Sequence, residues 1–483
     1  MRRFQILFFA VPLFSLLFCS ASFGQLAPTE VGNVLSSSRP VVIKNAGLGR
    51  GVNFGNMLEA PSEGEWGLFV EEIFFDKVVE AGMDHVRIPI SWTHHTSDFA
   101  PFQIDPEFFD RVDTVIDFAL QRGLRVIVNV HHYDELNADP QGEQERALAI
   151  WQQIATRYQN LPATVFFEIL NEPHGQFNDE PDLWNQFMAE ALDVIRQTNP
   201  TRKVLVGPVF YNSISELGSF APPNDDNLVT TVHYYEPFPF THQGAEWINP
   251  VPPVGVTWTG EAFGLNGGWQ NWSWNSDVES TNSALAVTYN EGYAGFQVHN
   301  PNLVSGATEL RFTIDQPLNL NISVRDLFND VEQFYSLTTS SGTQTYVVDI
   351  SDYGASNQIS NIFIQNNSPN PQNTFNISNF ELVTNDSVIS VINSEADRIA
   401  EAFRTAFQWG LDNHMPMHLG EFGAYNPADM DSRVRWTEAV RENAEQFRLD
   451  WAYWELAAGF GFYDPDNNSF RLPLLQALVP DFQ

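Results

Sequence analysis

Cysteine is almost absent from this sequence: the chain has 483 residues and a single cysteine, Cys19. A chain with one thiol can form no internal disulfide bond, and without that thiol it can form no thiolate metal site. Cys19 lies in an N-terminal segment that we expect to be removed, so the mature chain is predicted to have no thiol nucleophile either.

Positive charge is also scarce. The sequence has 24 Lys and Arg residues against 60 Asp and Glu residues, which gives a net charge of −36 at pH 7. Nucleic acids and anionic membranes would repel such a chain, so neither is an expected partner. The charge balance fits a neutral substrate and a soluble, secreted protein, and we expect a monomer.

Long apolar runs are missing beyond the N-terminus. Arg2 and Arg3 precede an apolar run at residues 6–18, and small residues follow at 20–22 and 24. This is the layout of a secretory signal peptide over residues 1–24, too short for a stable membrane span. We predict cleavage after Gly24 and an extracellular or periplasmic protein without a transmembrane segment. Phe18 is a poor neighbour for a lipidated cysteine, so lipoprotein anchoring through Cys19 is not expected.

The remaining chain is too long for one ordinary core, so two structural units are expected. Eight apolar segments have the length of buried strands, and most of them are followed by a helical pattern. Such an alternation predicts an α/β protein whose parallel strands close into a (β/α)8 TIM barrel. The predicted strands cover residues 49–53, 85–90, 124–131, 164–171, 203–209, 228–235, 417–421 and 449–456.

The interval between the sixth and seventh strands far exceeds the roughly 30 to 40 residues of one barrel unit. Residues 261–387 are rich in Asn, Ser, Thr and Gly, and apolar residues alternate with polar ones at 309–314, 318–324 and 374–382. Period-two patterns between Gly and Asn turns are typical of an antiparallel β-sandwich or jelly roll. We therefore predict a barrel of residues 25–260 and 388–483, interrupted by an inserted β-sandwich at 261–387.

Two predicted strands end near a glutamate: FFEILNEP at residues 166–173 contains Glu172, and MHLGEFG at 417–423 contains Glu421. Burying a carboxylate there is costly unless it has a partner or a role. One such residue could be a hydrogen-bonded core glutamate. Two of them, brought together by a closed barrel, are the groups that cleave a glycosidic bond.

Seven short motifs along the chain resemble those of glycoside hydrolase family 5, in the same order. That family comprises retaining endo-acting β-glycanases on a (β/α)8 barrel, mostly endo-β-1,4-glucanases (cellulases) and β-mannanases. The motifs are RGVN at 50–53, VRIP at 86–89, NVHHY at 129–133, NEP at 171–173, HYY at 233–235, GEFG at 420–423 and WAYW at 451–454.

The resemblance implies a role for each matching position. Glu172 would be the catalytic acid/base and Glu421 the nucleophile, and Arg87 could supply the positive field that keeps Glu421 ionised. Asn171 would bind the sugar 2-hydroxyl, Tyr235 would hold the nucleophile, and Trp454 would floor the site. His131 and His233 would line the cleft. Further substrate-binding positions implied by the resemblance are Asn56, Glu59, His132, His242, Trp247 and Phe460.

The implied function is a secreted retaining endo-β-1,4-glucanase acting on a β-linked polysaccharide or oligosaccharide. A β-mannanase, or a hydrolase of mixed-linkage glucan or xyloglucan, is the alternative within the enzyme class. A non-catalytic glycan-binding protein is the alternative from another class. No cofactor is expected, because the His131-His132 pair has no acidic or thiol partner at a metal-binding spacing.

The predicted sandwich begins with many aromatic residues, which have two interpretations. They could be the sandwich core, or they could make the insert a carbohydrate-binding module. A structural calcium ion would be compatible with such a fold, but no aspartate cluster marks a site for one. The residues are Trp269, Trp272, Trp274, Tyr289, Tyr293 and Phe296.

Overall fold

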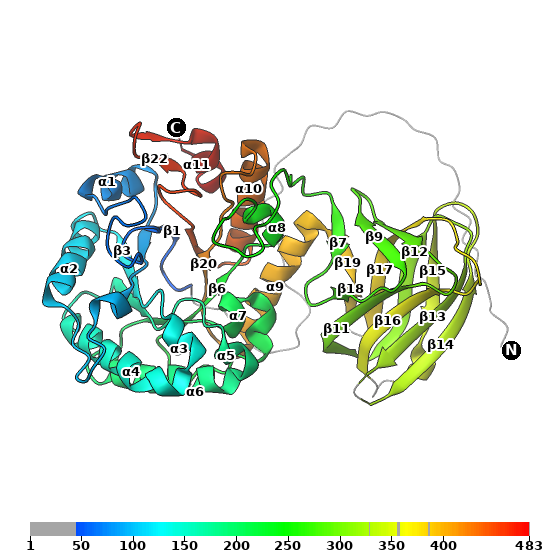
Figure 1. Cartoon of the computed structure of the whole chain (residues 1–483), viewed down its shortest axis with the longest axis horizontal. Helices are drawn as coiled ribbons and strands as arrows, with labels where there is room; N and C mark the ends of the chain where they lie inside the picture. The colour runs from blue at the N-terminus through cyan, green and yellow to red at the C-terminus, as the bar shows by residue number, and fades with distance from the viewer. Residues whose placement is uncertain (1–44, 328, 355–357, 385–386, 483) are drawn as a thin grey trace, which may run out of the picture. The chain divides into compact units, whose positions relative to one another are not determined.

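The computed structural model describes residues 45–327, 329–354, 358–384 and 387–482 (Figure 1). The predicted signal peptide and Cys19 lie outside the described residues. Eight parallel strands close into a barrel in the order β1-β2-β3-β4-β5-β6-β20-β21. Their bounds are β1 Arg50–Asn53, β2 His85–Ile88, β3 Arg125–Asn129, β4 Val165–Glu168, β5 Val204–Val206, β6 Leu228–His233, β20 Met417–Glu421 and β21 Asp450–Tyr453.

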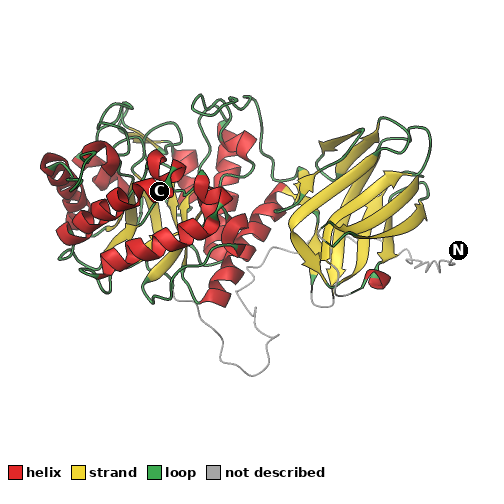
Figure 2. Ribbon diagram, turned by 60° about the horizontal axis from the view of Figure 1, so that its bottom comes forward, coloured by secondary structure: helices red, strands yellow, loops and turns green. Residues whose placement is uncertain are grey.

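Helices surround the barrel strands, as Figure 2 shows in red around the yellow strands. The long helices follow the strands, and short ones lie in the connections. The helices are α1 Glu72–Glu80, α2 Pro106–Gln121, α3 Asp134–Ala138, α4 Pro140–Arg157, α5 Gln176–Asp179, α6 Pro181–Arg196, α7 Val209–Asn212, α8 Phe238–Thr241, α9 Glu395–Asn413, α10 Met430–Gln446 and α11 Leu472–Leu478. Two short strands, β22 (Tyr463–Asp464) and β23 (Ser469–Phe470), pair after β21.

Local sequence explains where the long helices begin and which face they bury. In α2, the side chain of Asp105 accepts a hydrogen bond from the backbone N–H of Glu107, and Pro106 occupies the first turn. Asp429 caps α10 in the same way, and Ser394 caps α9. Each such cap stabilises its helix by about 1 kcal/mol. The buried residues of α2 recur every three or four positions, so one face packs on the barrel.

The chain between β6 and β20 forms two antiparallel sheets. One has the order β15-β12-β17-β10-β9, with β18 paired to β17, and the other has the order β14-β13-β16-β11-β8. The strands are β7 Phe263–Leu265, β8 Gln270–Asn271, β9 Ser276–Ser280, β10 Leu285–Tyr289, β11 Gly295–Ser305, β12 Ala307–Ile314, β13 Asn319–Asp326, β14 Val331–Thr338, β15 Gln344–Asp349, β16 Gln358–Asn366, β17 Phe375–Thr384, β18 Val388–Ser390 and β19 Ile392–Ser394. β7 and β19, which begin and end this segment, pair antiparallel.

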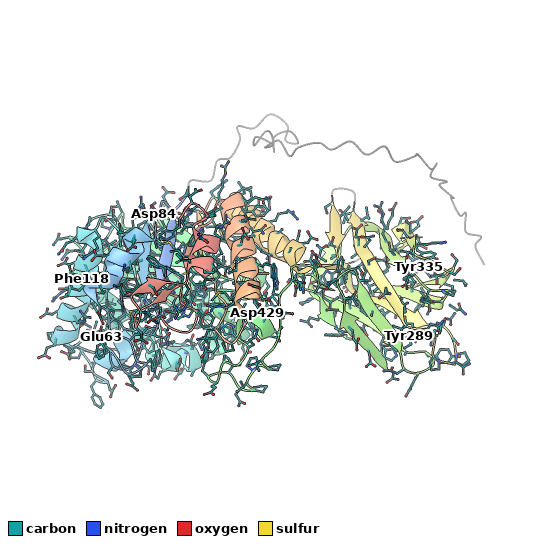
Figure 3. The ribbon with its side chains drawn as sticks, turned by 90° about the horizontal axis from the view of Figure 1, so that it is seen from above. Glu63, Asp84, Phe118, Tyr289, Tyr335 and Asp429 are labelled. Carbon is teal, nitrogen blue, oxygen red and sulfur yellow. The ribbon has the colours of Figure 1, made fainter. Side chains whose placement is uncertain are left out.

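The two sheets enclose a core of alternating apolar residues. Leu320, Ile322 and Val324 of β13 are fully or almost fully buried, which confirms the period-two pattern. Tyr289 of β10, labelled in Figure 3, lies in this core and donates its hydroxyl to the carbonyl oxygen of Ile364 at 2.6 Å. That bond joins the two sheets, because β10 and β16 belong to different ones.

The predicted fold class is confirmed: a closed parallel barrel with additional antiparallel sheets. The eight predicted strands lie within a few residues of the observed ones, most of the observed strands are shorter than expected, and the fourth has half its expected length. Its ladder ends at Glu168, and Glu172 follows in a turn with φ of 50°. Among the described residues, no helix is both long and apolar enough to span a membrane.

Candidate active site

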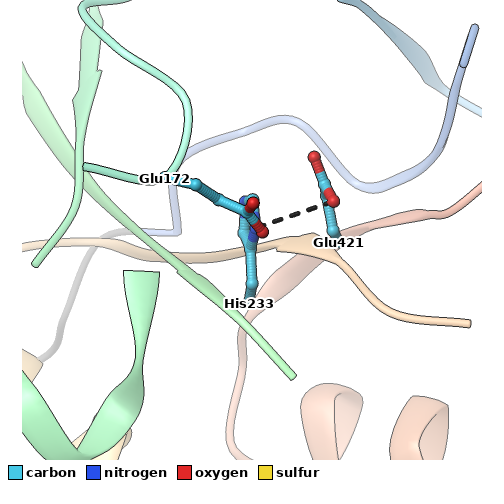
Figure 4. A group of neighbouring side chains, drawn as sticks. All are labelled: Glu172, His233 and Glu421. Carbon is cyan, nitrogen blue, oxygen red and sulfur yellow. Dashed lines mark hydrogen bonds and ion pairs between the residues drawn. The ribbon is translucent and has the colours of Figure 1, made fainter. Parts of the chain in front are cut away.

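Glu172 and Glu421 meet at the carboxyl end of the barrel. Glu421 is the last residue of β20, and Glu172 lies four residues beyond the end of β4. One carboxylate oxygen of each lies within 4.8 Å of the other, with His233 between them (Figure 4). The Glu421 side chain is 6% exposed and that of Glu172 is 25% exposed. The end of β20, the seventh barrel strand, therefore holds a buried carboxylate, and the loop after β4 holds a more accessible one that faces it across a short gap.

Arg87 of β2 lies beneath the two glutamates and is held there by hydrogen bonds to its neighbours. Its guanidinium is fully buried, and it donates to Glu421 Oε1 at 2.7 Å. It also forms a bidentate pair with Glu168, with distances of 2.6 and 2.7 Å. The remaining donors reach Asn53 Oδ1 at 2.8 Å and Asn171 Oδ1 at 2.7 Å. A guanidinium has five N–H groups, so every donor of Arg87 is engaged within the barrel.

His233 and Tyr235, at the end of β6, hold the two carboxylates in place. His233 Nδ1 lies 2.7 Å from Glu172 Oε1, and Asn212 Nδ2 donates to His233 Nε2 at 3.3 Å, which places the ring proton on Nδ1. Burial lowers the pKa of His233 to about 4, so the ring is neutral near pH 7 and orients Glu172 without adding charge. The Tyr235 hydroxyl donates to Glu421 Oε2 at 3.0 Å.

The two glutamates differ in their electrostatic surroundings. Burial raises the pKa of Glu172 to about 7, although the charge of Arg87 opposes this. Burial also raises the pKa of Glu421, and His233 and Arg87 lower it. Of these two, Arg87 carries the permanent charge and touches Glu421 directly. Burial thus raises the pKa of both carboxyl groups, and of the two only Glu421 accepts a hydrogen bond from the permanent charge of Arg87, which favours its anionic form.

Aromatic rings form the floor and sides of the cleft. The indole of Trp454 stacks parallel to His131, with ring centroids 5.6 Å apart. It also lies against Gly55, where an added Cβ would approach the ring to 2.9 Å, so any larger residue would displace Trp454. The side-chain oxygen of Asn171 accepts a hydrogen bond from Arg87, so its amide nitrogen is the group left to donate to a ligand.

All predicted site residues except Arg87 line one cleft, and Arg87 lies beneath it. Glu59 turns its carboxylate to the backbone N–H groups of Asn56 and Met57, so it shapes the β1–α1 loop. The lining residues among the predicted set are Asn56, Glu59, His131, His132, Asn171, Glu172, His233, Tyr235, His242, Trp247, Glu421, Trp454 and Phe460.

The cleft is also lined by residues that were not predicted from the sequence, among them Trp66, His174, Tyr211 and Tyr425. His174 directly follows the NEP motif and stacks on Tyr211, with centroids 4.7 Å apart. Trp66 is 43% exposed and contacts His132 edge-on. Their positions come from loop geometry, and only His174 has a sequence signal, its place beside Glu172.

Two other buried glutamates are explained by structural partners. Glu168 is paired with Arg87, as expected for a structural carboxylate. Glu455 accepts backbone N–H groups of Ala457, Ala458 and Phe460, and burial raises its pKa to about 7. Neither Glu168 nor Glu455 faces a second carboxyl group across an open gap, so Glu172 and Glu421 remain the candidate pair.

Within the described residues, Glu172, His233 and Glu421 also form a group whose ligand atoms are close enough for a metal ion. Two observations favour a proton-transfer site instead. Tyr235 and Arg87 each donate a hydrogen bond to a Glu421 oxygen, and Nδ1 of His233 carries a proton toward Glu172. A metal ion would have to bind the Glu421 oxygens that already accept these hydrogen bonds, and it would have to bind His233 Nδ1 without its proton.

A family model described as cellulase (glycosyl hydrolase family 5) matches residues 49–293. Endoglucanase H of Acetivibrio thermocellus is 43% identical over 196 residues, which are 41% of this chain and 22% of that protein. Endoglucanase C of the same organism is 32% identical over 212 residues, which are 41% of this chain and 60% of that protein. The chain thus spans between about a fifth and three fifths of these relatives.

Solved structures extend the similarity over most of the chain. An endoglucanase structure is 32% identical with a TM-score of 0.61, covering 90% of this chain and 97% of that one. Thermotoga maritima Cel5A, in complex with mannotriose, is 32% identical with a TM-score of 0.61 and covers 90% and 98%. The resemblance expected from the seven motifs is confirmed, and the chain belongs to glycosyl hydrolase family 5.

Proposed function

We propose that this protein is a secreted endo-β-1,4-glucanase that cleaves cellulose-type β-glucan with retention of configuration. The observation that carries this proposal is the short gap between Glu172 and Glu421. Retaining enzymes hold their two carboxyl groups roughly 5 to 5.5 Å apart, whereas inverting enzymes separate them by about 6.5 to 9.5 Å to admit a water molecule. Oxygens within 4.8 Å fit the retaining class.

In the first step, Glu421 attacks the anomeric carbon of the sugar. An ester bond forms to the carboxylate oxygen as the glycosidic C–O bond breaks, and the proton of Glu172 passes to the leaving oxygen. Tyr235 and Arg87 bind the two Glu421 oxygens and fix the direction of attack. In the second step, Glu172 takes a proton from water, whose oxygen replaces Glu421 at the same carbon.

The remaining cleft residues support binding of the sugar. The Asn171 amide nitrogen is proposed to donate to the 2-hydroxyl, and the Trp454 indole to pack against the C–H face of the ring. Such a site binds a neutral polymer by shape and hydrogen bonding, in agreement with the net charge of −36. The other cleft-lining residues are proposed to hold neighbouring sugar units.

The substitution Glu421→Gln tests the assignment. It keeps the size and burial of the side chain and removes the nucleophilic oxygen anion. We expect turnover of carboxymethylcellulose to fall by at least ~1,000-fold, while polymer binding persists. Glu145→Gln, an exposed residue in the middle of α4, is the matched control and should behave as the unchanged protein. Unchanged cleavage in Glu421→Gln would refute the role of this residue. Absence of cleavage in the unchanged protein, with binding retained, would favour a non-catalytic glycan-binding protein.

A β-mannanase is the second candidate, because a similar solved structure is described with mannotriose bound. Glucose and mannose differ at the C2 hydroxyl, near the proposed position of Asn171. Initial rates on carboxymethylcellulose, barley β-glucan, glucomannan and galactomannan would separate the candidates. We expect the glucans to be cleaved faster; preference for galactomannan would select the mannanase.

Secretion is part of the proposal and is supported by the charge and apolar pattern of residues 1–24. Expression of the full chain in a bacterial host, followed by N-terminal sequencing of protein outside the cytoplasm, tests it. A mature N-terminus at Gln25 is expected.

A further inference from the structure

The aromatic residues at the start of the sandwich fall into two groups. Trp269, Tyr289 and Phe296 are buried in its core, with at most 7% exposure. Trp272 and Tyr293 are 46% and 55% exposed. The core therefore explains only half of the aromatic residues that the sequence places there, and the rest need another explanation.

Strand register places Trp272 on the outer face of the five-stranded sheet. Phe296 and Val298 of β11 point into the core, so Gln297 and His299 point outward. The backbone N–H of Trp272 bonds the carbonyl oxygen of Gln297, and its indole stacks on His299 at 3.9 Å. The indole Nε1 donates to Gln270 at 3.0 Å. Trp272 is thus held flat, with one face supported and the other open.

The same register extends across the sheet. Gln297 pairs with Phe363 of β16, Phe363 with Ser323 of β13, and Ser323 with Phe334 of β14. Phe334 is 57% exposed. We call the positions Trp272, Gln297, Phe363, Ser323 and Phe334 the aromatic row. Because neighbouring strands lie about 4.8 Å apart, the row presents a ring at every second strand, roughly 10 Å from the next.

The neighbouring row is uncharged and rich in amides. It runs from Trp274 over Gly295 to Gln365 and Asn321. A Cβ on Gly295 would come within 2.2 Å of the Trp274 ring, so this glycine lets the indole lie flat on the sheet. On the other side of the aromatic row, Arg325 pairs with Asp330. The neutral amides on the first side match a hydroxyl-rich partner. The opposite side is charged, because Arg325 lies opposite Glu332, and Glu332 accepts a hydrogen bond from the hydroxyl of Ser323 in the row at 2.9 Å.

The second sheet provides an internal comparison. Register places Glu309, Arg311, Val347, Asp349 and Glu381 on its outer face, and these described positions include no aromatic ring. Both sheets share one core and the same solvent, so solvent exposure alone does not account for rings on one of them. Exposed aromatic residues gathered on one face indicate a binding surface.

We propose that the aromatic row binds a β-1,4-linked polysaccharide chain lying across the strands of the five-stranded sheet. Successive sugars in such a chain are turned over, so every second unit presents the same face. Rings at every second strand can then stack on alternate sugars while the amides of the neighbouring row bond their hydroxyl groups. This inference rests on the proposed function for the choice of polymer, since the barrel would cleave the chain that the sheet holds.

The test uses the full-length chain with Glu421→Gln, so that polymer is not degraded. Trp272→Ala with Phe334→Ala removes two half-exposed rings, and Val347→Ala on the other sheet, 55% exposed, is the control. Affinity electrophoresis in gels with soluble barley β-glucan or glucomannan measures binding. We expect the double variant to bind at least tenfold more weakly and the control to bind as its parent does.

A second measurement separates this surface from the catalytic cleft. With Glu421 intact, the double variant should keep kcat and KM on a short chromogenic cellooligosaccharide within twofold. Unchanged polymer affinity in the double variant, an equal loss in Val347→Ala, or impaired turnover of the short substrate would each overturn the proposal. If the unchanged protein cleaved no β-glucan but the double variant still lost polymer binding, the proposed function would fail and the binding surface would stand.

Discussion

Replacing Glu172 with Gln is expected to stabilise the protein in a pH-dependent way while removing catalysis. Burial raises the pKa of Glu172 to about 7 from an ordinary value of 4.5. The folded state therefore binds a proton more tightly than the unfolded state, and stability falls as pH rises from about 4.5 to 7. The difference corresponds to about 3 kcal/mol above pH 7, an upper value because the side chain is 25% exposed.

Glutamine stays neutral at every pH, so Glu172→Gln should avoid this cost. The variant is expected to match the parent near pH 4 and to exceed its thermal unfolding midpoint increasingly up to pH 8. Differential scanning calorimetry between pH 4 and 8 measures this, with Glu145→Gln as the exposed control. A stability difference that is constant with pH, or largest at pH 4, would refute the reasoning that burial raises this pKa.

The remaining predictions concern the neighbours of the catalytic pair. Tyr235→Phe removes one hydrogen bond to a charged oxygen, worth about 1.5 to 3 kcal/mol, so kcat should fall roughly 10- to 150-fold with little change in the unfolding midpoint. Steady-state kinetics measures this, and an unchanged kcat would contradict the role of Tyr235. Arg87→Met leaves Glu168 buried without a partner and should destabilise the fold by about 3 to 5 kcal/mol. Adding Glu168→Gln should restore much of the stability but no activity. A double variant that is no more stable than Arg87→Met would contradict the pairing of Arg87 with Glu168. Activity below pH 7 should exceed activity above it, because Glu172 must carry its proton; a rate that rises steadily to pH 9 would exclude that role. Treatment with EDTA should leave the rate unchanged, and loss of activity restored by a divalent metal would reassign Glu172, His233 and Glu421 as ligands.

The barrel was predictable because its strands are buried on both faces. β4 and β5 have every residue buried, so they stand out as short apolar runs separated by helical periodicity. The inserted strands were predictable from alternation where one face meets the core. The short strands β8 and β18 were not, because two or three residues carry no periodic signal.

The meeting of Glu172 and Glu421, the candidate catalytic pair, was predictable from motif order, and its surroundings were only partly so. Sequence indicated that Arg87 lies near Glu421, but the bidentate pair with Glu168 depends on the closure of the barrel. Trp66 and Tyr211 reach the cleft through loops whose course no pattern specifies. Likewise, a list of aromatic residues could not separate Trp272 from Trp269; only strand register shows which ring faces the core and which faces water.

The antiparallel pairing of β7 with β19 has a consequence for engineering. Phe263 lies opposite Ser394, and Leu265 opposite Ile392, so the two ends of the insert are about 5 Å apart. Because these ends are so close, the whole segment between β7 and β19 can be replaced by a very short linker, or exchanged for another domain, without distorting the barrel. Any graft would have to retain a capping side chain at position 394, because Ser394 also starts α9.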